Sequence, residues 1–257
     1  MNRACLAKNA TELASSTKLN LHEQKQHASY IRPIKNIFVR MKPKIIILIG
    51  FILFCLLFFG CGDHNDRNTY MTIRIDTQEW ITENLDVSVF RNGDPIPEVT
   101  SDEEWRKAGQ QGKPAWCYYE NKIENGKKLS KLYNWYAVND KRGLAPAGWH
   151  VSSDAEWRNA TDFLGGEDAA GTKMKSGTDW NQDGNGTNES SFTGLPGGCR
   201  DLNGKFNNKG TIGFWWSSSD YDKELAWYRC IDISPYYVYR TNYYKQNGLS
   251  VRCIKDY

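Results

Sequence analysis

The sequence predicts an α+β domain built from short helices, small antiparallel sheets and a long loop region. Helix-start patterns occur in the part of the chain that precedes this loop region. Residues 165–213 are rich in Gly, Asn, Asp, Ser and Thr, which favour turns and loops over regular structure. Residues 214–254 alternate as strands do and are divided by turn residues. Helices followed by a mainly antiparallel sheet are typical of the α+β class.

The first predicted element is a strand–turn–strand unit. Residues 71–76 alternate apolar and polar side chains, and residues 79–81 continue the pattern after a short break. Residues 92–95 (Asn-Gly-Asp-Pro) predict a turn. Ser101 is followed three residues later by Glu104, the spacing of a capping box, so a short helix is predicted to begin there.

The same helix-start pattern recurs at Ser153 and Glu156. This second helix is predicted to stop at Gly165-Gly166 and to bury four apolar side chains, those of Trp157, Ala160, Phe163 and Leu164. A third helix is predicted over residues 132–138 (LYNWYAV), with Leu132, Trp135 and Tyr136 on one face. The predicted late strands cover residues 214–219, 226–233, 236–243 and 249–254, with turns at Ser234-Pro235 and Asn247-Gly248.

Residues 45–60 form an unbroken run of sixteen apolar or glycine residues that ends at Cys61. Lys42 and Lys44 precede the run. A basic flank, an apolar stretch and a small residue before a cysteine resemble a bacterial lipoprotein signal peptide. We therefore expect residues 41–60 to be removed and Cys61 to carry a membrane lipid anchor. The alternative is a membrane-spanning helix, although a span needs about 20 apolar residues.

The anchor predicts a location in the bacterial cell envelope, at the outer membrane or cell surface. Residues 1–40 are interpreted as a mis-assigned or disordered extension, and residues 61–70 as a tether to the domain of residues 71–257. Residues 1–60 contain nine Lys or Arg and two Asp or Glu. Residues 61–257 contain 24 Lys or Arg and 28 Asp or Glu, which gives this part a net charge of −4. An acidic exported part does not predict a nucleic-acid partner.

Aromatic residues are concentrated in the exported part, which holds all ten Trp and 13 of the 14 Tyr. They are expected either to pack a core or to form an exposed binding surface. Four of them are candidates for ligand binding, namely Trp215, Trp216, Tyr237 and Tyr239. Strand alternation places Tyr237 and Tyr239 on one face, where they can stack on a sugar or pair across strands.

Four cysteines follow Cys61 in the chain: Cys117, Cys199, Cys230 and Cys253. Outside the cytoplasm they can form two disulfides, with three possible connectivities, and buried free thiols are the alternative. No CxxC spacing occurs, and His64 and His150 are the histidines after residue 60, which argues against a zinc site. For His150, a hydrogen-bonded structural role is favoured over a general base.

A possible calcium loop begins at Asp179. Oxygen-bearing side chains at alternate positions, with a glycine at position six, resemble an EF-hand loop, and the candidate ligands are Asp179, Asn181, Asp183, Asn185 and Glu189. The twelfth position is Ser190, and Glu189 falls one residue early. Calcium is therefore the cofactor considered, with a turn-rich loop that bonds its own backbone as the alternative.

Six motifs occur in order and together resemble one known family: WITENL (80–85), LYNWYAV (132–138), APAGWHV with DAEW (145–157), LPGG (195–198), WWSSS (215–219) and SVRC (250–253). They are similar to the Fibrobacter succinogenes major paralogous domain, found in lipoproteins of Bacteroidetes and Fibrobacteres, over roughly residues 71–257. The resemblance implies a C-type lectin-like fold, which formylglycine-generating enzymes share. The catalytic cysteine pair of those enzymes has no match, because Cys199 has no partner cysteine nearby.

Three functions are compatible with these features. The favoured one is a non-catalytic binding domain, displayed on a lipid anchor, for a glycan or an envelope protein. The second is a hydrolase or oxidase with an active site in the loops of residues 165–222. Residues 217–219 lack the G-x-S-x-G context of a hydrolase nucleophile, so no catalytic residue is assigned. The third is a structural or adhesive surface component.

Overall fold

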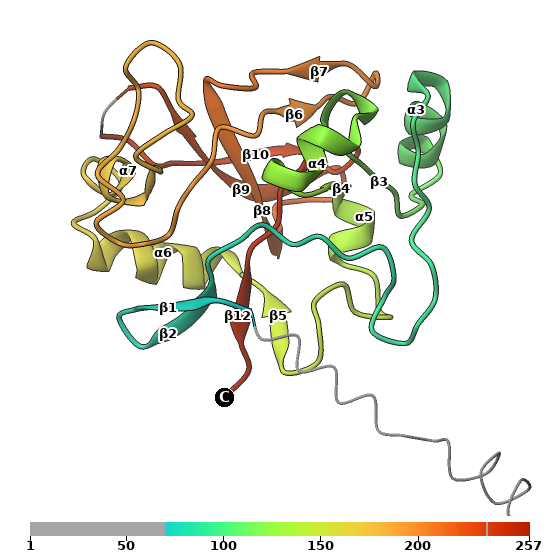
Figure 1. Ribbon diagram of the computed structural model, residues 1–257. Coiled ribbons are helices and arrows are strands. Elements are labelled where there is room, and N and C mark those ends of the chain that lie inside the picture. The colour runs from blue at the N-terminus through green and yellow to red at the C-terminus, as the bar shows by residue number, and fades with distance from the viewer. Residues whose placement is uncertain (1–69, 235) are drawn as a thin grey trace, which may run out of the picture. The chain divides into compact units, whose positions relative to one another are not determined.

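The computed structural model describes residues 70–234 and 236–257 (Figure 1). The helices are α3 (Asp102–Gln110), α4 (Ile123–Leu129), α5 (Trp135–Val138), α6 (Asp154–Phe163) and α7 (Ala170–Met174), with a 3₁₀ helix η3 (Tyr119–Asn121). The strands are β1 (Thr72–Ile75), β2 (Gln78–Ile81), β3 (Trp116–Cys117), β4 (Leu132–Asn134), β5 (Trp149–Val151), β6 (Cys199–Arg200), β7 (Phe206–Asn207), β8 (Ile212–Asp220), β9 (Leu225–Asp232), β10 (Tyr239–Tyr244), β11 (Gly248–Leu249) and β12 (Cys253–Lys255). The α+β prediction is confirmed, whereas the predicted signal peptide and Cys61 lie outside the described residues.

The strands form three sheets, in the orders β1-β2-β12-β5, β10-β9-β8 and β3-β4-β11-β6-β7. The predicted strand–turn–strand unit is the antiparallel pair β1–β2. In the same sheet Ile254 of β12 pairs with both Trp80 of β2 and His150 of β5. The end of the chain therefore closes a sheet that the first described residues begin.

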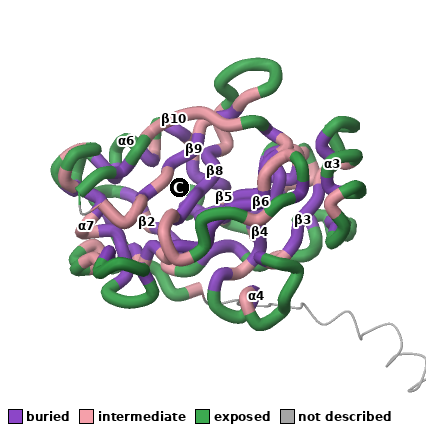
Figure 2. Tube along the Cα trace, turned by 90° about the horizontal axis from the view of Figure 1, so that it is seen from above, coloured by how far each residue is buried: buried purple, intermediate pink, exposed green. Residues whose placement is uncertain are grey.

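The β8–β9–β10 sheet separates two apolar cores. Trp216 of β8 pairs with Tyr228 of β9 and joins the first core, whereas its neighbour Trp215 pairs with Arg229 and joins the second. Successive side chains of a strand point to opposite faces, so the Trp-Trp pair supplies one ring to each core. β10 forms the outer edge of this sheet. Figure 2 shows buried residues along β8 and β9, while α3 is mostly exposed.

Both predicted capped helices are confirmed. The Ser101 hydroxyl accepts a hydrogen bond from the Glu104 backbone at the start of α3. At α6, Ser153 and Glu156 make both bonds of a capping box. Figure 1 shows α6 between the β1–β2 pair and the β8–β9–β10 sheet, where it packs against β8 and β9.

The prediction that Phe163 is buried is wrong, because its side chain is 61% exposed. Besides Asp154 at the start of α6, the buried residues of this helix and its cap are Trp157, Ala160, Thr161 and Leu164. The last four form one stripe. These positions follow the i, i+3, i+4, i+7 spacing of one helix face. Phe163 lies outside that stripe and faces solvent.

The predicted helix over residues 132–138 is only half right. Its first three residues form β4, which pairs with β3 on one side and with β11 on the other. Only Trp135–Val138 is helical, and Asn134 caps this single turn by accepting a bond from the Ala137 backbone. The pairing partners of β4 come from distant parts of the sequence, so the local apolar spacing did not reveal them.

The late strands are confirmed with shifted ends. β10 begins at Tyr239 rather than at residue 236, and the predicted strand over residues 249–254 is divided into β11 and β12. Within the described ranges, no helix has the length and apolar content that crossing a membrane requires.

Candidate ligand-binding surface

The motif residues that look most distinctive in sequence form a buried polar hub. The Asn84 side-chain oxygen accepts hydrogen bonds from Trp215 Nε1 at 2.9 Å and from Arg252 Nε at 2.8 Å. Arg252 also donates to the backbone oxygens of Ile81 at 3.1 Å and Phe192 at 2.9 Å. Burial lowers the pKa of Arg252 to about 9, despite the opposing effect of Glu83. This hub joins the beginning, middle and end of the domain.

The prediction that Trp215 and Trp216 bind a ligand is wrong, because both rings are fully buried. Trp216 Nε1 donates to the Tyr133 backbone oxygen at 2.9 Å. The Trp215 ring packs beside Phe192, with ring centroids 5.7 Å apart. Each indole has a hydrogen-bond partner and an apolar surrounding, so the two rings are part of the core.

The other two predicted aromatic residues lie at the surface. Tyr237 and Tyr239 are 42% and 39% exposed, and their rings stack with centroids 5.6 Å apart and planes 26° apart. The two side chains therefore share a face, as their spacing predicts. Tyr239 is the first residue of the edge strand β10, and Tyr237 lies in the segment just before it.

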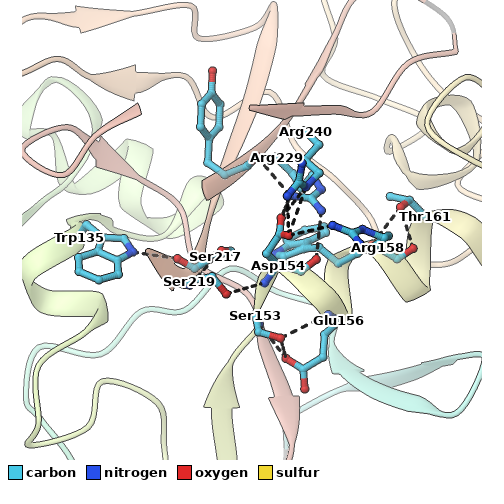
Figure 3. A network of polar contacts seen from close by, with 12 residues as sticks. Trp135, Ser153, Asp154, Glu156, Arg158, Thr161, Ser217, Ser219, Arg229 and Arg240 are labelled. Carbon is cyan, nitrogen blue, oxygen red and sulfur yellow. Dashed lines mark hydrogen bonds and ion pairs between the residues drawn. The ribbon is translucent and has the colours of Figure 1, made fainter. Parts of the chain in front are cut away.

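On the other face of the β8–β9–β10 sheet from Tyr239 lies a cluster of charged side chains, which Figure 3 shows around Asp154 at the start of α6. Asp154 Oδ1 accepts hydrogen bonds from Arg229 Nη1 at 2.8 Å and from Arg240 Nε at 2.9 Å. Asp154 Oδ2 accepts from Arg240 Nη2 at 2.9 Å and from Arg158 Nη2 at 3.4 Å. The arginine cluster, Arg158, Arg229 and Arg240, thus joins α6 to β9 and β10.

Burial alone would raise the pKa of Asp154, but hydrogen bonds from Arg240 and Arg229 outweigh it and lower the pKa. The carboxylate is therefore charged at neutral pH. Arg229 is fully buried, and its Nε has no hydrogen-bond partner among the described residues. Three guanidinium groups surround one carboxylate, which leaves an excess of positive charge.

Single-sequence reasoning missed this cluster. Arg229 and Arg240 lie 75 and 86 positions from Asp154, and each looks like an ordinary strand residue. The available signal was an acidic residue in the first turn of a capped helix, which is common for reasons of helix stability alone. Only the sheet register brings the two arginines side by side, since Arg240 pairs directly with Arg229.

The candidate calcium ligands do not line one cavity. Asp179 pairs with Lys128 and lies with Asn181 beside a cavity of about 290 Å³, whereas Glu189 lines a separate one of about 310 Å³. Asn185 accepts a hydrogen bond from the Trp180 backbone at 3.1 Å, and Asp183 is exposed. No group of three or more His, Cys, Asp or Glu side chains suited to a metal occurs in residues 70–234 and 236–257. Calcium binding remains a prediction.

The four cysteines are free thiols, so the disulfides considered from the sequence are not formed here. Cys117, Cys199 and Cys253 are buried, and Cys230 is partly buried. Burial raises the pKa of each thiol to about 12. Cys117 belongs to a different apolar core from Cys199 and Cys253. The alternative of buried free thiols describes them, since cysteine packs as a small apolar side chain.

His150 makes the structural contacts favoured from the sequence. Its Nε2 lies 2.7 Å from Glu156 Oε1, and its Nδ1 lies 2.7 Å from Asp256 Oδ1. Burial opposes the charged ring, but the hydrogen bonds with Glu156 and Asp256 raise the pKa of His150 above its ordinary value. The imidazole therefore links β5 to α6 and to the end of the chain.

The fold and surface define an α+β domain whose motif residues build the interior and whose exposed features are stacked tyrosines and an arginine cluster. The Fibrobacter succinogenes major domain matches residues 73–255. The chain belongs to this family, as its motifs indicate. Comparison with curated proteins gave no match, and comparison with solved structures gave none either.

Proposed function

We propose that this protein is an envelope lipoprotein that displays a non-catalytic binding domain for a glycan or a protein at the cell surface. The observation that supports it most directly is the exposed stacked pair Tyr237–Tyr239 at the edge strand β10. Aromatic rings offer large apolar contact area with a polar tip, which suits both sugar faces and protein partners. A glycan is the partner that the binding experiment addresses.

The anchor part of the proposal depends on Cys61 and the apolar run before it. Tyr70 begins the described chain and packs against Trp149 of β5, with ring centroids 6.1 Å apart. Figure 1 shows β5 at the end of the domain opposite β10.

Processing is tested by mass spectrometry of the protein from its native membrane. The expected product begins at Cys61 and carries acyl chains on that residue. Cys61→Ser is expected to leave the precursor unprocessed and to abolish acylation, whereas Cys55→Ser, in the apolar run, is the matched control that leaves processing intact. An unmodified Cys61 with residues 41–60 still attached would contradict the anchor.

A C-type lectin-like fold and calcium at residues 179–189 are further parts of the proposal. They are supported by the family resemblance and by the oxygen-bearing spacing of the loop. In the structure the Asp179 carboxylate pairs with Lys128, and this contact lowers the pKa of Asp179. Calcium would therefore have to compete with Lys128 for Asp179. A change in ligand affinity or melting temperature on addition of calcium would support a calcium site. No change at millimolar calcium would exclude one.

Binding is tested on a glycan array with the protein purified in detergent. Tyr237→Ala and Tyr239→Ala are each expected to weaken binding about tenfold, because each loses a stacking ring worth about 0.5–1.5 kcal/mol beyond its buried area. Tyr257→Ala is the matched control, since Tyr257 is also exposed but contacts Thr77 and Glu79 of the β1–β2 hairpin rather than β10. No binding to any glycan would exclude the glycan form of the proposal.

A further inference from the structure

We propose that the guanidinium groups of the exposed Arg158 and the partly exposed Arg240 form an oxyanion subsite, so that the ligand is an acidic glycan with uronate carboxylates or sulfate esters. This inference deepens the proposed function and rests on it. The uronate and the sulfate present the same chemistry to the protein, a planar or tetrahedral group of negatively charged oxygens that a guanidinium can bind through two parallel hydrogen bonds.

The first argument is convergence. Arg240 Nη2 lies 2.9 Å and Arg158 Nη2 lies 3.4 Å from the same oxygen, Asp154 Oδ2, so the two nitrogens are at most 6.3 Å apart. Their side chains are 26% and 54% exposed. Asp154 therefore holds two like-charged groups together at the surface, where they would otherwise repel each other.

The second argument is charge. One carboxylate, Asp154, serves three guanidinium groups, and the buried Arg229 keeps an Nε without a hydrogen-bond partner. Glu167 also interacts with Arg229 and Arg240, but its side chain is exposed and it cancels only one further charge. With both carboxylates counted, the group remains positive by one charge. A bound oxyanion would balance it.

The third argument is preorganisation. The Arg240 guanidinium lies 3.5 Å from the centroid of the Trp227 ring, and Asp154 binds its Nε and Nη2. Among the described residues, Arg240 Nη1 and the Nε and Nη1 of Arg158 donate no hydrogen bond, so these nitrogens are available as donors. Tyr221 meets Trp227 edge to face at 4.8 Å, which extends an aromatic surface beside the charged groups. A sugar ring and its acidic substituent could thus be held together.

The test measures affinity for three polysaccharide probes: alginate as a polyuronate, chondroitin sulfate as a sulfate ester, and dextran as a neutral glycan. The protein is expected to bind the acidic probes at least tenfold more tightly than dextran. Arg158→Gln is expected to weaken acidic binding at least tenfold with dextran binding unchanged. Arg106→Gln makes the same charge change at an exposed position of α3 and is expected to have no effect.

Arg158 is the primary variant because its contact with Asp154 is longer and more exposed than that of Arg240, so its loss disturbs the fold less than Arg240→Gln would. Circular dichroism and the melting temperature establish that each variant is folded. Acidic binding that falls in Arg158→Gln but not in Arg106→Gln supports the subsite, and the stronger of the two acidic probes identifies uronate or sulfate.

Three outcomes would overturn the inference, and they bear differently on the proposed function. Binding to dextran that depends on Tyr237 and Tyr239 but not on Arg158 would remove the subsite and leave the binding domain in place. Equal loss in Arg158→Gln and Arg106→Gln would show attraction by net charge alone and would also remove it. No binding to alginate or chondroitin sulfate would remove the subsite, whereas the glycan form of the proposed function is excluded only if the glycan array is silent as well.

Discussion

At the scale of single residues, the feature that organises this domain is the amide of Asn84. Its oxygen accepts from Trp215 and Arg252, and its nitrogen donates to the Leu129 backbone at 3.0 Å. An indole and a guanidinium buried without an acceptor are costly, since each unmade bond costs about 1–3 kcal/mol. One amide therefore makes three sequence motifs dependent on one another.

Asn84→Ala is expected to lower the free energy of unfolding by at least about 2 kcal/mol, because Trp215 Nε1 and Arg252 Nε both lose an acceptor. Equilibrium urea unfolding measures the change. Asn203→Ala, at an exposed loop position, is the matched control and should change stability by less than about 0.5 kcal/mol. Equal effects of the two substitutions would show that the hub does not stabilise the fold.

At the scale of elements, His150 connects three of them. It lies on β5, contacts the capping-box residue Glu156 of α6, and contacts Asp256 after β12. Burial would raise the pKa of Glu156, but its bonds to Ser153 and His150 lower it. The charged pair is thus favoured at pH values above the titration of Glu156 and below that of His150.

The raised pKa of His150 predicts how stability depends on pH. The folded state binds the proton more tightly than the unfolded chain, whose histidine titrates near about 6.5. The contribution is complete below that pH and is lost as the pH rises through the higher folded pKa. Melting temperatures from pH 5.5 to 9 should therefore show an advantage over His150→Gln that shrinks as the pH rises. A constant difference would contradict this role.

Local signals in the sequence predicted local structure well. The capping residues Ser101 and Ser153 start helices as expected, because a cap involves only residues three apart. Phe163 was misplaced because an apolar residue near a buried stripe does not have to belong to it. β4 was taken for helix because its pairing with β3 and β11 is decided by distant residues.

The candidate surface was predictable only in part. The spacing of Tyr237 and Tyr239 places them on one face, and the structure shows them stacked and exposed. In the sequence, Trp215 and Trp216 look like the same kind of residue, an aromatic side chain in a predicted strand. Their burial differs from that of the tyrosines because it depends on which elements cover each face of the sheet. The arginine cluster depends on the β9–β10 register and on where α6 packs, and neither can be read from one sequence.

At the scale of the whole molecule, the thiols report on the integrity of the cores. A thiol whose pKa is about 12 has a thiolate fraction on the order of 10⁻⁴ at pH 8, so it reacts slowly. The native protein should react with a thiol reagent only slowly, with Cys230 first because it is partly exposed. In guanidinium without reductant, all four cysteines after Cys61 should react at once. Two or none reacting would show that these cysteines form disulfides.

The position of β12 has a consequence for how the β1-β2-β12-β5 sheet is held together. Its residues Cys253–Lys255 lie between β2 and β5, and each of these two strands pairs with β12 rather than with the other. A protease that cut the chain just before Cys253 would therefore remove the link between the β1–β2 hairpin and β5, and the hairpin would become an unsupported flap.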